Sequence, residues 1–273
     1  MALRVPTPVL ARFNPYSGLM TMISREAKNP LLAPLVDRLW YCEVPGAAGQ
    51  ETVLPTGRAQ LVIGLDPDHA LSVIQGPTTR PRTIEAAAQR RAVGVSFRLG
   101  ALASCCPADG TALTDQLVDL DQLWGSGFRS LGDELCELTT ADQVFDHLEL
   151  VLGGWAARYG GVVAPDVVSA AARLEAQRPV ADVAAALDVD RRRLGQRFKA
   201  SVGFGMKHYG RLRRFELALR SLRSADPPPL SQVAADLGYA DQSHLTRDFR
   251  HFAGRPPAEL HGDGSPSPTH IVD

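Results

Sequence analysis

An internal repeat is the feature that most constrains the fold of this 273-residue chain. The segment PVADVAAALDVDRRRLGQRFKASVG, residues 179–203, matches PLSQVAADLGYADQSHLTRDFRHFAG, residues 229–254, with one inserted residue near Tyr239. The matching positions are apolar, alanine or glycine: Val183 with Val233, Ala184 and Ala185 with Ala234 and Ala235, Leu187 with Leu237, Leu194 with Leu245, Phe198 with Phe249, and Gly203 with Gly254. Core positions repeated in this way indicate two copies of one supersecondary unit.

Each copy has the pattern of two helices around a short turn. Asp190 is predicted to cap a helix over residues 191–201, and Asp241 lies near the start of the corresponding helix, because a carboxylate accepts hydrogen bonds from the free N–H groups there. Gly203 and Gly254 follow the last apolar turn, where helices commonly end. The pattern predicts helix-turn-helix geometry, in which the second helix can enter the major groove of DNA.

The second helix of each copy combines a narrow apolar face with many polar side chains. The apolar residues would hold the helix on its scaffold, and the polar ones would be free to meet base edges and phosphates. Gln, Ser, Thr and Arg hydrogen-bond bases, and Arg can hold guanine with two bonds at once. A polar surface helix without a partner is the alternative interpretation, and the repetition of the pattern argues against it.

The net charge of −1 hides an asymmetry between the two halves of the chain. Residues 1–164 carry 13 basic and 17 acidic side chains, whereas residues 165–262 carry 16 basic and 11 acidic ones. Between Asp190 and Arg223, 11 basic residues stand against two acidic ones. Such a block inside a structured region is a candidate footprint for a polyanion, and a solvated helix face is the alternative.

The segment between the copies, residues 205–223, is predicted to be one amphipathic helix, because apolar residues recur every three or four positions. A helix of this length extends for roughly 28 Å. Successive major grooves on one face of DNA are about 34 Å apart. A stiff spacer of this size would place two reading helices about one turn of DNA apart.

The first half of the chain has the pattern of a β-rich domain. The segments LVDRLWYCEV, AQLVIGL and RAVGVSFRLG are rich in β-branched and aromatic residues, and turn signals separate them. Several short strands at close spacing predict a small barrel or sandwich. After Cys106 the spacing of apolar residues becomes helical.

One helical segment, ADQVFDHLELVLGGWAARYG, carries a continuous apolar stripe. The stripe consists of Val144, Leu148, Val151, Leu152 and Trp155. A helix packed on the barrel is one interpretation, and an exposed dimer face is the other.

The sequence offers little for catalysis or for binding a metal ion. It contains no G-x-S-x-G, Walker-type or H-E-x-x-H motif, and His69 is the only histidine before residue 140. We expect no catalytic residue, no metal site and no cofactor. Adjacent Cys105 and Cys106 allow a redox or metalloid sensor, or simply two small semi-buried residues. Three tryptophans, Trp40, Trp124 and Trp155, could line an effector pocket or belong to the core.

The sequence also bears on the compartment. No stretch approaches the apolar length of a membrane span, and the N-terminus has no convincing secretory signal. The four cysteines form no C-x-x-C pair. We therefore expect a cytoplasmic, reduced chain with no membrane partner.

These residues carry a resemblance to a known family. Residues 165–262 resemble the paired helix-turn-helix domain of the AraC/XylS family of bacterial transcription regulators, through LGYADQSHLTRDFRHFAGRPPAEL in the second motif and LRRFELALRSL in the linker helix. Two features depart from the family pattern, namely Asp190 where Ser is common and the unusually basic run Arg191–Arg193. The N-terminal half resembles the cupin-like sensor of one branch of this family, through LLAPLVDRLWYCEV, VLPTGRAQLVIGL, QGPTTRP, VGVSFRLGA and LVDLDQLWG.

The resemblance implies an α+β chain with an N-terminal cupin-like β-barrel and flanking helices, followed by an all-α domain of two helix-turn-helix motifs joined by a linker helix. We expect an irregular arm over residues 1–30, a sensor and dimerisation domain over 31–160, the DNA-binding domain over 165–262 and a disordered tail over 263–273.

The resemblance also implies roles for single residues. The expected base-reading side chains are Arg192 and Gln196 in the first motif and Gln242, Ser243 and Arg247 in the second. The expected phosphate contacts, which position the protein without reading sequence, are Arg191, Arg193, Lys199, His244 and Arg250. The expected core residues are Leu194, Phe198, Leu245 and Phe249.

The function implied is sequence-specific regulation of transcription, by reading two successive major grooves of double-stranded DNA. A small-molecule effector or a partner would act at the N-terminal domain, the chain would form a homodimer, and an activator would also contact RNA polymerase. One alternative is a ligand-binding or enzymatic barrel whose helical half is a protein-interaction module. Another is an architectural protein that binds any duplex equally well.

Overall fold

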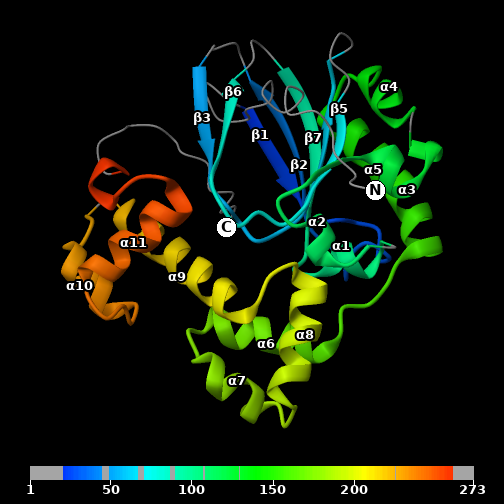
Figure 1. Cartoon of the computed structure of the whole chain (residues 1–273). Coiled ribbons are helices and arrows are strands. Elements are labelled where there is room, and N and C mark those ends of the chain that lie inside the picture. The colour runs from blue at the N-terminus through cyan, green and yellow to red at the C-terminus, as the bar shows by residue number, and fades with distance from the viewer. Residues whose placement is uncertain are drawn as a thin grey trace.

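The computed structural model of the chain describes residues 21–44, 49–66, 71–86, 90–106, 108–128, 130–224 and 226–260. A β-rich part comes first and a helical part follows it (Figure 1). The expected α+β class and the order of its two parts are therefore confirmed. The predicted tail, residues 263–273, and His69 lie outside the described residues.

The β-rich part contains two antiparallel sheets. The order of strands in the six-stranded sheet is β1 (Thr21–Arg25), β2 (Val36–Val44), β7 (Arg90–Phe97), β4 (Gln60–Gly64), β5 (Leu71–Gln75) and β8 (Leu117–Asp119). The second sheet pairs β3 (Gly49–Val53) with β6 (Arg82–Ala86). Among the described residues, the expected barrel is thus built from two hydrogen-bonded ladders instead of one that closes on itself.

Strand β1 corrects one expectation. The arm predicted over residues 1–30 is not irregular throughout, because Thr21–Arg25 pairs along its whole length with β2, from Thr21 opposite Glu43 to Arg25 opposite Leu39. The many prolines before this segment suggested irregular chain. The pairing partner that turns TMISR into an edge strand is β2, which lies beyond a connection of ten residues, and the composition of TMISR itself does not reveal it.

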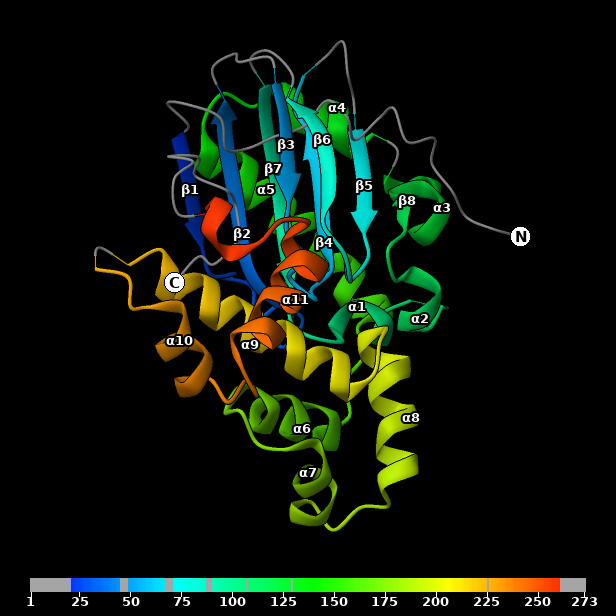
Figure 2. The ribbon, with the colours of Figure 1, turned by 60° about the vertical axis from the view of Figure 1, so that its left-hand side comes forward.

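The six-stranded sheet is covered on both sides. The two-stranded sheet lies on one side, and helices α3 (Leu120–Trp124), α4 (Leu131–Cys136) and α5 (Ala141–Tyr159) lie on the other (Figures 1 and 2). Side chains alternate between the two faces of a strand. In β2, Leu39 therefore joins the large core under the helices, whereas Trp40 belongs to a smaller apolar cluster on the opposite face.

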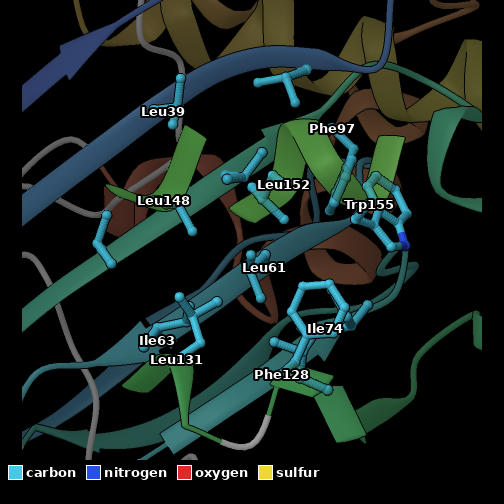
Figure 3. Close-up of a cluster of buried hydrophobic side chains, with 14 of the residues drawn as sticks. Leu39, Leu61, Ile63, Ile74, Phe97, Phe128, Leu131, Leu148, Leu152 and Trp155 are labelled. Carbon is cyan, nitrogen blue, oxygen red and sulfur yellow. The ribbon is translucent and has the colours of Figure 1, made fainter. Parts of the chain in front are cut away.

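Helix α5 packs on this sheet through its apolar stripe. Leu148, Leu152 and Trp155 reach down to Leu61 and Ile74 of the strands (Figure 3). Of the predicted stripe, Val144, Leu148, Leu152 and Trp155 are buried and Val151 is half-buried. The interpretation of a helix packed on the sheet is confirmed, and the stripe is not an exposed dimer face.

The helical part repeats a three-helix unit around one shared core. The first unit consists of α6 (Pro165–Glu175), α7 (Val180–Ala186) and α8 (Arg191–Val202). The second consists of α9 (Met206–Leu222), α10 (Leu230–Asp236) and α11 (Gln242–Ala253), and the short turn η4 (Pro257–Leu260) follows it. The predicted helix-turn-helix copies are α7–α8 and α10–α11.

The repeat extends one helix further than the sequence comparison indicates. The buried residues of α6 are Val167, Ala170, Ala171 and Leu174, and the same spacing recurs in α9 as Phe215, Ala218, Leu219 and Leu222. Val167 corresponds to Phe215 and Ala171 to Leu219, and these differences in size hide the match in the sequence. The linker helix is thus also the first helix of the second unit.

The predicted helix ends are confirmed in both copies. The Asp190 carboxylate accepts a hydrogen bond from the backbone N–H of Arg193, and Asp241 accepts one from that of His244. Gly203 and Gly254 end the two helices in the left-handed conformation, with φ of 100° and 77°. Glycine adopts this conformation without the penalty that a Cβ atom brings.

Candidate nucleic-acid interface

The second helices of the two copies, α8 and α11, are each anchored by one apolar face. Leu194, Phe198, Leu245 and Phe249 are completely buried, as predicted. The Phe198 ring contacts Tyr209 with ring centroids 5.7 Å apart, and the Phe249 ring contacts Phe215 with centroids 4.9 Å apart. Both rings that receive these contacts belong to α9, so one helix carries both motifs.

The residues predicted to read bases lie on the free sides of these helices. Arg192 and Gln196 are exposed on α8, and Gln242, Ser243 and Arg247 are exposed on α11. The Arg247 Nε atom donates a hydrogen bond to the backbone carbonyl of Ser243, at 3.3 Å. This bond leaves the other guanidinium N–H groups available to a partner.

The residues predicted to contact phosphate are exposed with one exception. Arg191, Arg193, Lys199 and Arg250 are exposed. His244 is half-buried, and its ring meets Tyr239 edge to face with centroids 5.2 Å apart. This packing makes His244 the least accessible of the five candidates.

Several basic residues of the predicted polyanion footprint instead hold the fold together. Arg197 forms an ion pair with Asp166 of α6, Arg213 forms one with Glu216, and the Arg214 guanidinium lies 5.2 Å from the centre of the Tyr239 ring. Arg211 pairs with buried Asp248. The local charge of the segment therefore overstates the positive surface that is available to DNA.

Asp248 is a residue that sequence reasoning missed. It lies between the reading-helix residues Arg247 and Phe249, yet it is completely buried. Arg211 donates to its Oδ1 from Nε at 3.1 Å and from Nη2 at 2.6 Å. An acidic residue on the apolar face of α11 was the available signal, because a buried carboxylate requires a partner.

The two reading helices pack on different parts of α9. The contacts with Tyr209 and Phe215 are six residues apart, which is about 9 Å of helix rise. The sequence predicted that the full length of the linker helix sets the spacing of α8 and α11. The structure shows that this length does not separate them. Their separation depends on how each one packs against α9.

Other candidate chemistry finds no support among the described side chains. No group of three or more His, Cys, Asp or Glu residues there could hold a metal ion. Burial raises the pKa of the Cys106 thiol to about 12, so the reactive thiolate is disfavoured. Trp40 and Trp155 are buried, and half-buried Trp124 contacts Trp155 in a tilted arrangement with ring centroids 4.2 Å apart. These tryptophans are parts of the core.

Every helix of the described chain is too short or too polar to cross a lipid bilayer.

This geometry defines a double helix-turn-helix protein, and comparison with known proteins identifies the type. Residues 170–262 match a family model described as a helix-turn-helix domain, and residues 27–119 match a domain of unknown function, DUF6597. An AraC-like transcription regulator of Streptomyces lividans is 35% identical over 117 residues, and one of Streptomyces antibioticus is 36% identical over 120 residues. Each match covers 41% of this chain and 38% of the relative.

The chain thus carries a helix-turn-helix domain behind a DUF6597 domain, and the resemblance of its C-terminal part to AraC-like regulators is confirmed. Similarity to solved structures is weaker. ToxT from Vibrio cholerae is 11% identical, with a TM-score of 0.40 over 88% of this chain and 97% of its own. The C-terminal domain of AraT, a response regulator from Geobacillus stearothermophilus, is 22% identical, with a TM-score of 0.34 over 36% of this chain and 85% of its own.

Proposed function

We propose that this protein is a sequence-specific transcription regulator that places α8 and α11 in two successive major grooves of DNA. The proposal rests on one observation, which is that α8 and α11 repeat the same kind of exposed polar surface. Two copies of a helix-turn-helix unit share one core, and each presents an exposed row of hydrogen-bonding side chains on its second helix. A single copy could be an accident of surface composition, whereas two copies on one scaffold are what the reading of two successive major grooves requires.

The base contacts are assigned to the exposed side chains of the two reading helices. In this proposal Arg192 and Gln196 read one half-site, and Gln242, Ser243 and Arg247 read the other. Each side chain either donates hydrogen bonds or both donates and accepts them, as reading base edges in the major groove requires.

The phosphate contacts are assigned to the basic residues beside them. Arg191, Arg193, Lys199 and Arg250 are exposed, and His244 is retained as a weaker fifth candidate. Salt bridges within the fold occupy Arg197 and Arg211, so we do not assign them to DNA. Phosphate contacts set affinity and its dependence on salt, not the choice of sequence.

The remaining partners are also proposals. We infer that a small-molecule effector or a protein partner acts through residues 31–160, that the chain works as a homodimer in the cytoplasm, and that an activator would also contact RNA polymerase. The names of the Streptomyces relatives, of which this chain matches less than half the length, support a role in transcription regulation.

The test is selection from a random DNA pool with the purified full-length chain, followed by gel-shift measurements over a series of salt concentrations. We expect one enriched motif with two half-sites. We also expect affinity for it to exceed that for random duplex by about a thousandfold or more. Equal affinity for all duplexes would support an architectural protein instead. The absence of any salt-sensitive affinity would favour a protein-interaction module.

A further inference from the structure

Three loops of the β-rich domain contact the helical domain, and all of them lie at the same end of the sheets (Figures 1 and 2). In the loop between β3 and β4, Leu54 belongs to the core of the helical domain. Gly57 follows in the left-handed conformation, and a Cβ atom there would lie 2.9 Å from Leu212 of α9. In the loop between β5 and β6, Pro81 lies against Gly254, 3.8 Å from where its Cβ atom would be.

The third contact joins α8 to the short helix α2 (Gly110–Leu113), and it is the tightest. A Cβ atom on Gly110 would lie 2.7 Å from the backbone nitrogen of Gly203, 2.8 Å from the carbonyl oxygen of Ala200 and 2.9 Å from that of Ser201. A Cβ atom on Gly203 would in turn clash with the Thr114 hydroxyl. The two backbones thus meet directly, and a backbone cannot rotate away as a flexible side chain can.

The contacts touch α8 and α11 at corresponding places, closely at α8 and by ordinary van der Waals contact at α11. Gly203 is the C-terminal cap of α8 and Gly254 is that of α11, so each helix touches the β-rich domain at its C-terminal end. The exposed residues assigned to bases lie on the remainder of each helix. The β-rich domain therefore holds the two reading helices without covering their free faces.

This arrangement bears on the angle between the two motifs. Each motif rests on α9 through a ring contact, and the second motif also through the Arg211–Asp248 ion pair. Contacts of both C-terminal ends with this domain restrict their movement on α9, because each contacting segment connects to a strand of the hydrogen-bonded six-stranded sheet. Small changes of angle at α9 would otherwise become large displacements at the DNA.

We propose that Gly110, through its contact with Gly203, is a positioning residue that sets the spacing of the two DNA half-sites that the chain accepts. The inference rests on the proposed function and deepens it. The contacts with the β-rich domain, which we call the splint, fix α8 and α11 relative to each other. Weakening these contacts widens the range of accepted half-site spacings and leaves the bases read within each half-site unchanged.

The test compares Gly110→Ala with Gly154→Ala. Gly110 does not have positive φ, so alanine adds no backbone strain there, and its methyl group presses on α8. Gly154 belongs to α5 of the same domain, and its Cβ position has nothing within 4 Å, which makes it a matched control. Affinity is measured for the selected DNA site and for versions with one or two base pairs added or removed between the half-sites.

The parent chain and Gly154→Ala are expected to lose about tenfold or more in affinity on the altered spacings, comparable to one mismatched base pair. For Gly110→Ala the loss is expected to shrink to about twofold, with the base preference within each half-site retained. Equal spacing selectivity in all three proteins would overturn the inference. So would a simultaneous loss of spacing and base preference in a Gly110→Ala protein that melts like the parent.

A second measurement needs no DNA. Spin labels are attached through Ala185→Cys and Ala235→Cys, two exposed and corresponding positions of the motifs, in a Cys106→Ser and Cys136→Ser background. We expect a narrow distribution of distances in the parent and a clearly broader one with Gly110→Ala. If Gly110→Ala does not fold, Gly57→Asn replaces it, since Asn tolerates positive φ. An unchanged width would refute the splint, whereas a parent that selects no DNA sequence would refute only the proposed function.

Discussion

Arg211 of α9 and Asp248 of α11 form an ion pair in which two guanidinium nitrogens bond one carboxylate oxygen, at 3.1 and 2.6 Å. The first motif has an ion pair at the same position of its second helix, with the sign of that residue reversed. Arg197, which matches Asp248 in the repeat, pairs there with Asp166 of α6. Two reading helices with similar apolar faces are thus distinguished by opposite charges.

The ion pair of the second motif is expected to matter for stability. Asp248→Asn would leave the Arg211 guanidinium without its counterion. Breaking a buried pair costs about 3–5 kcal/mol, and we expect about 2–3 kcal/mol because the Arg211 side chain is 35% exposed and can rehydrate. Urea unfolding measures the loss, with Asp236→Asn on the exposed side of α10 as the control. Equal unfolding midpoints for the two variants would refute this role of the pair.

Arg247 provides the test of base reading. Arg247→Ala is expected to lose about 1–3 kcal/mol of binding free energy at the selected DNA site and to relax the preference for one base pair. Affinity for random duplex should change little. Arg173→Ala, at an exposed arginine of α6, is the control and should bind as the parent does. Equal losses on selected and random DNA would show that Arg247 contacts phosphate instead.

Arg193 provides the complementary test. Because a phosphate contact is independent of sequence, Arg193→Ala should weaken binding to all duplexes and lower the slope of log affinity against log salt by about one. Gel shifts at four or more salt concentrations measure this slope. A loss confined to the selected site would move Arg193 into the group of base-reading residues.

His208 of α9 makes stability depend on pH. Burial lowers its pKa to about 4, and the nearby charges of His251 and Arg211 act in the same direction, while Asp115 and Asp248 oppose them. A histidine whose pKa is lower in the folded state binds fewer protons there than in the unfolded state. Its contribution to stability is therefore complete above about pH 6.5 and is lost as the pH falls towards 4.

The measurement is the difference in unfolding free energy between the parent and His208→Gln over this pH range. The difference is needed because Glu216 acts in the opposite sense. Burial raises the Glu216 pKa to about 7, so its contribution to stability falls as the pH rises towards 7. We expect the difference curve to decline as the pH falls from 6.5. A flat curve would show that His208 titrates normally in the folded chain.

The sequence by itself determined everything that depends on neighbouring residues. The repeat, the apolar faces around Leu194 and Phe249, and the helix ends at Asp190 and Gly254 follow from local periodicity and capping, which act within about one or two turns. The β-rich character of the first half and the stripe on α5 are local as well. These features sufficed to predict two helix-turn-helix units behind a sheet domain, and to place the candidate DNA contacts on two exposed helices.

Only the tertiary structure decided the features that depend on which separate segments of the chain meet. Thr21–Arg25 became a strand because β2 lies beside it, and Asp248 is buried because Arg211 reaches it from another helix. The sequence does not reveal that Gly110 meets Gly203, since 92 residues separate them and neither glycine carries a side chain that marks a partner. Local chemistry thus fixed the elements and their faces. The packing of separate segments against each other decided which charged side chains form ion pairs within the fold. It also decided which contacts hold α8 and α11.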